Sequence, residues 1–310
     1  MPKTAVLLAS FNSEPYLSEL IQSILKQSER DFSLYIRDDC SSDESFNSAA
    51  ALAGEDGRIR LARNEKPSGS AQNNFFTLLL ECPKHEYYMF ADGDDFWLPE
   101  KIRITLERMR ELEARHGANT PLLVHGDLAV ADGKLNIIAP SLFKYEKLSP
   151  ERKSLKNLLA QNNVTGCTVM INQALREFIP ARPKSSVMHD WWCALIAAAF
   201  GEISVIYEPL VLYRQHGSNE VGAYEAGDLS LAAARFFNSE RNRRIYSAMF
   251  AQAACFAETF KERLSPGQLE SCLAYAGLAH KGKAARLACV FKYGFYKNTL
   301  LRNLGQLLAI

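Results

Sequence analysis

The stretch "YYMFADGDDFW", residues 87–97, passes from a hydrophobic run into three carboxylates, Asp92, Asp94 and Asp95, and then returns to aromatic residues. The apolar part has the length of a buried strand. Like charges this close repel one another unless water solvates them or a cation lies among them. The D-x-D pair alone therefore leaves two interpretations open, a solvated turn and a Mg²⁺ or Mn²⁺ site. The flanking aromatic residues favour a turn set among packed side chains.

The sequence before this stretch alternates between strand and helix patterns. Continuous apolar runs of strand length occupy residues 4–10, 32–39, 58–65 and 86–92, and segments with helical spacing lie between them at 13–27, 41–54 and 69–82. This alternation predicts an α/β fold with a mostly parallel, open, Rossmann-like sheet flanked by helices. Ligands of such sheets bind at the carboxyl ends of the strands. Polar residues follow all four predicted strands, namely Ser10, Asn12, Asp38, Asp39, Asn64 and the acids at 92–95.

The rest of the chain divides into a mixed part and a helical part. We expect strands within 121–132, 165–172 and 202–219 and a helix at 186–200, whereas Ala-rich helical segments without a strand signal follow Gly227. The predicted domains are a catalytic domain at 1–224 and a helical appendage at 225–310.

Composition excludes several classes of protein. The 310 residues carry a net charge of +1, which argues against nucleic-acid binding through bulk charge. Seven scattered cysteines without a C-x-x-C pair suggest neither a zinc site nor disulfides and fit a reducing cytoplasm. We expect no signal peptide. We also expect no transmembrane helix, because the sequence has no run of 18 apolar residues.

Four motifs in register resemble the family 2 glycosyltransferases, enzymes with the GT-A fold. They are "LLASFNSEPYL" (7–17), "IRDDCSSDES" (36–45), "NEKPSGSAQNNF" (64–75) and "FADGDDFWLPEK" (90–101), and the similarity covers roughly residues 3–220. The "DGDDFW" form is most similar to the bacterial rhamnosyltransferase-like branch. The resemblance implies that the donor is a nucleotide-diphosphate sugar, linked to dTDP or UDP.

The resemblance also implies roles for the residues at the strand ends. Asp38 or Asp39 would accept a hydrogen bond from the base N3–H, and Asp92 with Gly93 would face the ribose. At residues 71–73 the family commonly has Ala-Arg-Asn, and Gln72 replaces the arginine here. The remaining predicted donor contacts are Ala9, Ser10, Asn12, Gln72 and Asn73.

The resemblance implies a metal site as well. Asp94 matches the metal ligand that bridges a Mn²⁺ or Mg²⁺ ion to the donor phosphates, and His216 lies where related enzymes supply a further ligand. Arg214 is a candidate for the diphosphate, although a surface ion pair explains it equally well from the residues alone. The chain has no GxxxxGK[ST] phosphate loop.

Asp190, in "MHDWW" (188–192), is the candidate general base that deprotonates the acceptor hydroxyl. A helix N-cap explains an aspartate at this place equally well. The resemblance favours the base, because Asp190 stands where the family has its Glu-Asp motif and His189 replaces the glutamate.

The predicted function is a metal-dependent inverting glycosyltransferase that moves a sugar, with rhamnose as a branch-level assignment, to a hydroxyl of a glycan acceptor. The resemblance implies a lipid-linked acceptor and a role in bacterial surface polysaccharide synthesis. The alternative is a non-catalytic nucleotide-sugar or glycan-binding module of the same fold. A phosphohydrolase with a D-x-D nucleophile fits poorly, because the first strand ends in "ASFNS".

Residues 281–310 contain six Lys or Arg and no acid, spread among Leu, Phe, Tyr and Val. This composition suits an interfacial amphipathic helix on an anionic membrane. It suits a helix packed on the catalytic domain equally well. The resemblance favours the first interpretation, a peripheral contact with the inner face of the cell membrane, because related enzymes extend lipid-linked glycans there.

Overall fold

The computed structural model describes residues 2–216, 223 and 239–310. Its contacts divide the chain into two compact units. The first comprises Met1–Leu142, Val164–Arg182 and Gly201–Ala223, and the second comprises Phe143–Asn163, Pro183–Phe200 and Tyr224–Ile310. The domain boundary expected between residues 224 and 225 stays a prediction.

A seven-stranded sheet forms the centre of the first unit, in the order β10-β6-β9-β4-β1-β2-β3. All its neighbours pair in parallel except β9, which is antiparallel to β4 and β6. The apolar side chains of β1 and β4 are buried on both faces, as their continuous hydrophobic runs predict. The strands are β1 (Thr4–Ser10), β2 (Phe32–Asp38), β3 (Ile59–Arg63), β4 (Tyr87–Asp92), β6 (Leu122–Gly126), β9 (Met170–Asn172) and β10 (Glu202–Ile206).

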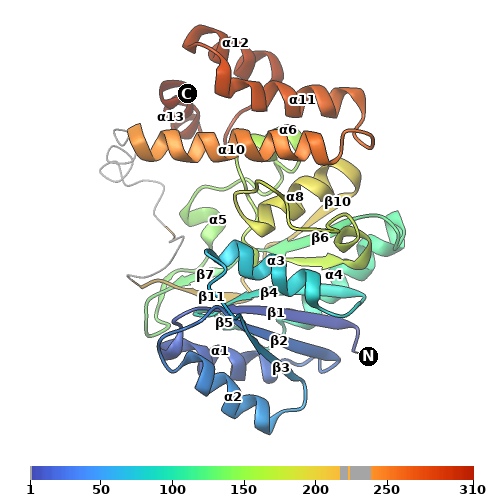
Figure 1. The fold of residues 1–310 in the computed structure, drawn as a ribbon, viewed down its shortest axis with the longest axis vertical. Coiled ribbons are helices and arrows are strands. Elements are labelled where there is room, and N and C mark those ends of the chain that lie inside the picture. Colours follow the sequence, from blue (N-terminus) through green and yellow to red (C-terminus); the bar gives the residue numbers. More distant parts are fainter. Residues whose placement is uncertain (1, 217–222, 224–238) are drawn as a thin grey trace. The chain divides into compact units, whose positions relative to one another are not determined.

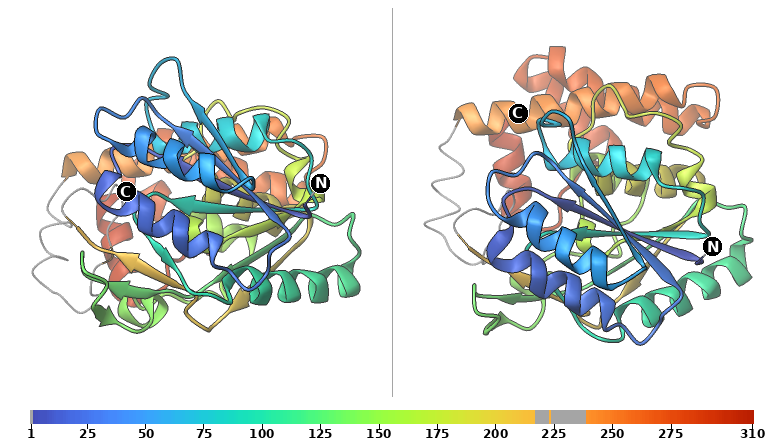
Figure 2. Two further views of the ribbon diagram at one scale, coloured as in Figure 1. Left: turned by 90° about the horizontal axis from the view of Figure 1, so that it is seen from below. Right: turned by 60° about the horizontal axis from the view of Figure 1, so that its bottom comes forward.

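Helices cover both faces of this sheet (Figures 1 and 2). The chain advances from β1 to β3 through α1 (Glu14–Leu25) and α2 (Ser45–Glu55), and α3 (Ala71–Glu81) carries it back to β4. Right-handed crossovers that run in opposite directions place their helices on opposite faces. Figure 1 accordingly shows α1 and α2 together below the strands and α3 above them. A fourth helix, α4 (Lys101–His116), packs against β6 and β10.

A smaller sheet in the first unit has the order β5-β11-β7-β8. Its strands are β5 (Phe96–Trp97), β7 (Ala129–Ala131), β8 (Ile137–Ala139) and β11 (Val211–Arg214). β5 directly follows the acidic turn, and Val211 in β11 pairs with Trp97. The chain after β11 is thereby brought to the acidic turn, which the sequence pattern alone did not show. Within 165–172 only β9 is a strand, because residues Gly166–Thr168 form a 3-10 turn, η1.

The described part of the second unit is helical. Aromatic contacts link its helices: Trp192 packs edge-on against Phe256, and Tyr275 packs against both Phe250 and Phe295. Each of these rings is buried. The helices are α5 (Leu142–Tyr145, whose first residue belongs to the first unit), α6 (Leu155–Ala160), α8 (His189–Phe200), α10 (Ser239–Thr259), α11 (Pro266–Ala276), η2 (Gly277–His280), α12 (Lys283–Tyr293) and α13 (Leu300–Ala309).

The basic tail forms two helices instead of one. α12 ends at Gly294, whose φ of +70° is the left-handed conformation that glycine adopts without a steric cost, and α13 begins after the Thr299 N-cap. Among the described residues, no helix combines the length and hydrophobicity needed to cross a membrane.

Candidate functional site

The strand register gathers the predicted donor residues at one edge of the large sheet. Ala9 lies opposite Asp92 of β4, and Ser10 lies opposite Asp38 of β2. The chain order 3-2-1-4 reverses between β1 and β4, and ligands of open α/β sheets bind at such a reversal. The end of β1 therefore stands between two carboxylates that are 54 residues apart in sequence, Asp38 and Asp92.

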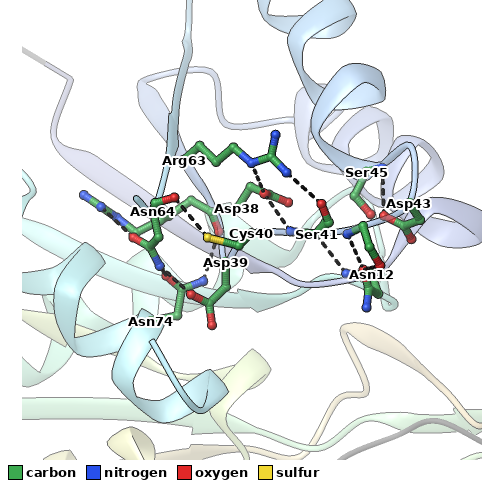
Figure 3. A network of polar contacts seen from close by, with 12 residues as sticks. Asn12, Asp38, Asp39, Cys40, Ser41, Asp43, Ser45, Arg63, Asn64 and Asn74 are labelled. Carbon is green, nitrogen blue, oxygen red and sulfur yellow. Dashed lines mark hydrogen bonds and ion pairs between the residues drawn. The ribbon is translucent and has the colours of Figure 1, made fainter. Parts of the chain in front are cut away.

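The Asp39 carboxylate is occupied within the protein (Figure 3). Its Oδ1 accepts hydrogen bonds from Asn64 Nδ2 at 2.6 Å and from the Ser68 amide at 2.7 Å, and its Oδ2 accepts one from Ser68 Oγ at 2.7 Å. Three donors from the segment after β3 thus surround this buried side chain. Its main contribution to the site is to hold the loop that leads into α3.

Asp38 keeps a carboxylate oxygen available. Oδ2 accepts from the Ser41 amide at 3.0 Å and lies 3.2 Å from Arg63 Nε, whereas Oδ1 is buried and has no hydrogen-bond partner in the described chain. Ser10 Oγ, at the register position opposite, is also buried and unpartnered in the described chain. Buried polar atoms without partners are rare in proteins and point to a ligand or water. Of the two aspartates, Asp38 is thus the better candidate to accept from a nucleobase.

Asn12 clamps the loop after β1. It adopts a left-handed φ of 48°, which asparagine tolerates, and its Oδ1 accepts from the Ser42 amide at 2.9 Å. The next two amides, of Ser13 and Glu14, are satisfied by Ser45 Oγ and Asp43 Oδ2. Side chains of the loop after β2 and of the first residue of α2 therefore complete the start of α1 and fix the β1 loop, and Figure 3 shows Asn12 beside Ser41.

The segment before α3 is ordered by caps. Ser70 is the N-cap and accepts from the Asn73 amide at 3.2 Å, and Asn73 Nδ2 donates back to Ser68 O at 2.7 Å. Gln72 lies beside it in the first turn and is partly exposed. The donor contacts expected of Gln72 and Asn73 stay predictions.

Close packing explains the glycine of the acidic turn. A Cβ at Gly93 would lie only 2.9 Å from Ser13 Cβ, closer than real Cβ atoms approach one another. The loop after β1 therefore rests directly on the backbone between Asp92 and Asp94. Only glycine allows these two strand ends to approach this closely.

Asp94 and His216 meet although 122 residues separate them. His216 Nε2 lies 2.8 Å from Asp94 Oδ2, and both side chains are partly exposed. The imidazole also stacks on Tyr16, with ring centroids 4.9 Å apart. A carboxylate oxygen and an imidazole nitrogen are thus aimed at one point at the edge of the sheet.

This pair fits a divalent cation. Its two donor atoms come from the residues predicted as ligands, they converge without an intervening side chain, and solvent reaches both. Oxygen and imidazole donors suit Mn²⁺, while Mg²⁺ prefers oxygen alone. The role of both residues as ligands stays a prediction.

Arg214 is buried behind the pair instead of facing outward. Its Nε donates to Asp94 O at 2.8 Å, Nη1 donates to Gly133 O at 2.6 Å, and Nη2 lies 2.5 Å from Glu19 Oε2. Its guanidinium also covers the ring of Tyr16 at 4.5 Å. A diphosphate contact by Arg214 stays a prediction and would compete with these contacts inside the protein.

Beneath the acidic turn lies a buried cluster that sequence reasoning missed. Asp95, Lys101 and Cys167 are each at most 1% exposed, and the Lys101 ammonium lies 3.4 Å from the centroid of the Trp97 ring. Burial, followed by the charges of Asp94 and Asp92, raises the pKa of Asp95 well above its usual range. Burial lowers the pKa of Lys101 to about 7. Asp95 and Lys101 lie in the same motif, residues 90–101, but only the fold shows that the Lys101 side chain turns inward.

One atom each of Asp92, Asp95 and Cys167 lies within 4.8 Å of the others, and these residues are a group of potential metal ligands in the described chain. The raised pKa of Asp95 disfavours its carboxylate form, and burial likewise raises the pKa of the Cys167 thiol well above its usual range. A carboxyl group or a thiol must lose its proton before it binds a metal ion. Asp94 and His216 are therefore the better candidate ligands.

Asp190 belongs to the second unit. It lies in the first turn of α8, where its Oδ1 accepts from the Trp191 amide at 2.8 Å and its Oδ2 accepts from Asn162 Nδ2 at 3.2 Å. Trp191 and Trp192, which follow it in α8, are buried in the core. Asp190 is thus the second residue of α8 and not its N-cap, and its role as general base stays a prediction.

Comparisons with known proteins agree with this architecture. The chain is 23% identical to the dTDP-rhamnosyl transferase RfbG of Shigella flexneri over 227 residues, which cover 70% of this chain and 74% of that protein. It is 26% identical over 147 residues, 46% of this chain and 54% of the other, to WfgD of Escherichia coli, a UDP-Glc:alpha-D-GlcNAc-diphosphoundecaprenol beta-1,3-glucosyltransferase.

Among solved structures, the mannosyltransferase PcManGT of Pyrobaculum calidifontis, in complex with GDP-Man and Mn²⁺, superposes with a TM-score of 0.53 at 17% identity. The match covers 99% of this chain and 84% of that one, and it shows the GT-A fold. The model of the family "Glycosyl transferase family 2" matches residues 5–178, more than half of the sequence. The chain therefore belongs to glycosyl transferase family 2.

Proposed function

We propose that this glycosyltransferase is metal-dependent and inverting, and that it moves a sugar from a nucleotide-diphosphate donor to a hydroxyl of a glycan acceptor. The observation that carries the proposal is the convergence of Asp94 and His216 at 2.8 Å beside the carboxyl ends of β1 and β4. These two side chains come from distant segments, and the family places the donor at this edge of the sheet.

The donor would bind along the strand ends. Asp38 Oδ1 and Ser10 Oγ are buried acceptor atoms that would face the nucleobase, and Asp92, at the end of β4 beside Gly93, would face the ribose. A uracil or a thymine presents an N3–H to such an acceptor, which fits a UDP- or dTDP-linked donor. The name of RfbG supports dTDP-rhamnose and the name of WfgD supports UDP-glucose, so the similarity supports either base.

Asp94 and His216 would hold Mn²⁺ or Mg²⁺, and the imidazole favours Mn²⁺. Such a cation, when bound, supplies Lewis-acid stabilisation for the charge that develops on the leaving diphosphate. Arg214 positions this pair from behind through the Asp94 carbonyl. Tyr16 fixes the plane of the imidazole.

Asp190 would act as the general base. Its carboxylate would take the proton of the acceptor hydroxyl as that oxygen attacks the anomeric carbon and the bond to the diphosphate breaks, which inverts the configuration. Asn162 and the Trp191 amide orient the two carboxylate oxygens, so Asp190 is held in one rotamer.

A lipid-linked glycan acceptor is supported by WfgD, whose name describes a diphosphoundecaprenol-linked substrate. We propose on this basis that the enzyme works in bacterial surface polysaccharide synthesis at the cytoplasmic face of the membrane. The competing proposal is a non-catalytic binding module of the same fold. Such a module would bind the nucleotide sugar at the strand ends but would not require Asp190 as a base.

The test is a panel of UDP-, dTDP- and GDP-linked sugars, each with and without Mn²⁺, scored by thermal unfolding. A donor at a hundred times its Kd stabilises the folded protein by about 2.7 kcal/mol, which corresponds to a shift of several degrees. We expect such a shift only for a UDP- or dTDP-linked sugar, and only with metal. If no nucleotide sugar gives a shift in either condition, the transferase proposal fails.

The Asp190→Asn variant separates enzyme from binding module. We expect it to keep the donor-induced shift but to release nucleoside diphosphate from the donor, with water as acceptor, roughly 10²- to 10⁴-fold more slowly. A variant that loses only thermal stability and retains its turnover would show that Asp190 stabilises the first turn of α8 and is not the base.

A further inference from the structure

The helix α13 turns its hydrophobic side away from the protein. Leu300, Leu301, Leu304 and Leu308 are between 48% and 77% exposed. The spacing of 300, 304 and 308 places these leucines on one side of the helix, with Leu301 next to them. We call these four residues the leucine face. In a surface helix of a globular protein the apolar side ordinarily faces the core.

The polar side of α13 is what attaches it to its own unit. Gln306 is 2% exposed, and its Nε2 donates to Phe295 O at 2.7 Å. Asn303 binds Lys297 O and Thr299 O, and Arg302 forms an ion pair with Glu146 at 3.3 Å. These contacts fix the orientation of the helix, so the exposure of the leucine face is built into the packing.

Exposed apolar residues concentrate in this part of the described chain. Twelve large apolar side chains are exposed among the described residues, and six of them lie between residues 291 and 308. Besides the leucine face these are Phe291 and Tyr296, whose rings contact each other with centroids 6.3 Å apart. Apolar patches of this kind mark interaction sites, and aromatic rings are typical of membrane interfaces.

The charges beside the leucine face identify the occupant. Lys283 Nζ donates to the carbonyl of Leu308 at 2.6 Å, which places a cation at the end of that face. Lys281, Arg286 and Lys292 belong to the same acid-free segment, 281–310. Leucines and aromatic rings in a segment that carries basic residues and no acid are complementary to an anionic lipid headgroup layer with acyl chains beneath it.

We propose that the leucine face of α13, together with Lys283 and the other basic residues of segment 281–310, docks the enzyme on an anionic membrane surface. The helix lies in the headgroup region with its leucines toward the acyl chains and does not cross the bilayer. Membrane binding by this surface requires neither the donor nor the metal, so it can be tested independently of the transferase reaction.

The experiment is flotation of the full chain with vesicles of phosphatidylglycerol and phosphatidylethanolamine. The test variant carries Leu300→Ser, Leu304→Ser and Leu308→Ser, which remove three outward side chains without touching the packed side of α13. The matched control carries Ile137→Ser, Ile138→Ser and Leu273→Ser, three other exposed positions. Circular dichroism verifies that both variants keep the helical content of the wild type.

We expect the wild type and the control to float with the anionic vesicles, and the bound-to-free ratio of the test variant to fall roughly tenfold to a hundredfold. Vesicles of phosphatidylcholine alone should bind the wild type weakly. Equal flotation of test variant and control would overturn the proposal. So would a wild-type dimer in light scattering that the three serines convert to a monomer, because the occupant would then be a second copy of the chain.

Discussion

Adjacent aspartates in the turn at 92–95 have different chemistry because they face different surroundings. Asp94 is partly exposed and meets His216, whereas Asp95 is fully buried and accepts from the Arg214 amide at 3.4 Å. The first suits a metal ligand. The second, whose pKa burial raises, suits a structural role in the turn. The three acids, Asp92, Asp94 and Asp95, are therefore not interchangeable, although they are close together in sequence.

His189 is a second buried residue whose protonation matters. Burial lowers its pKa to about 3, so the folded protein keeps the imidazole neutral while the unfolded chain binds a proton near pH 6.5. The unfolded state then holds more protons between these values, and stability must fall as the pH falls through that window. From the two pKa values the loss at pH 5, relative to pH 8, is about 2 kcal/mol.

The prediction is tested with His189→Leu, which cannot be protonated. Urea unfolding of the second unit, followed at pH 8 and pH 5, should show that this variant loses about 2 kcal/mol less than the wild type between the two pH values. Identical losses in both proteins would contradict the assignment of this pH dependence to His189.

At the residue scale, the sequence located polar residues at the strand ends but not the orientation of their side chains. Asp38 and Asp39 stood as equal alternatives, and the difference between them depends on Asn64 and Ser68, which the loop after β3 supplies. Lys101 was missed because nothing in a sequence distinguishes a solvated lysine from one held over Trp97. The inward course of Arg214 depends on Gly133 and Glu19, more than 80 residues away.

At the scale of elements, the site consists of loops that rest on one another. The β1 loop is held by Ser41 and Ser42 from the β2 loop and by Ser45 at the start of α2, and it contacts the acidic turn at Gly93. Each strand end is therefore positioned by its neighbours, and we expect a change at one contact to shift the adjacent loop.

Gly93→Ala tests this coupling. The new Cβ must displace Ser13, so we expect a loss of roughly 1–3 kcal/mol in unfolding free energy, typical of overpacking, together with weaker nucleotide binding. Urea unfolding and nucleotide titration measure the two effects. The control is Gly54→Ala in α2, where nothing lies within 4 Å and alanine should stabilise the helix by up to ~1 kcal/mol. If Gly93→Ala behaves like the control, the close approach is not needed.

The ends of β1 to β4 could be predicted to within two residues and those of α1 to α3 to within four, whereas α4 was not predicted and the later elements were predicted less well. β1 to β4 are long, continuous apolar runs, which is the strongest signal that a buried strand gives. β5 and β8 have only two and three residues and owe their existence to pairing with β11 and β7. Such short strands have no periodicity of their own, so only the tertiary fold reveals them.

At the scale of the whole molecule, the two units carry different parts of the proposed reaction. The first holds the donor residues and the candidate metal ligands, and the second holds Asp190 and the leucine face. The GT-A fold was predictable because the four motifs lie in register along the chain. The grouping of residues 143–163 and 183–200 with the C-terminal helices was not, because it depends on helix packing between distant segments.

The central claim is that Asp94 and His216 bind a cation which in turn binds the donor diphosphate. Calorimetric titration of UDP and dTDP, with Mn²⁺ and with EDTA, tests it most directly. We predict that Mn²⁺ raises the affinity of one nucleotide by at least about tenfold, and that Asp94→Asn and His216→Gln abolish this gain. Glu177→Gln, which removes the carboxylate of an exposed pair with Lys84, should retain the full gain. Nucleotide affinity that is the same with Mn²⁺ and EDTA, or a gain that survives both site variants, would contradict the account.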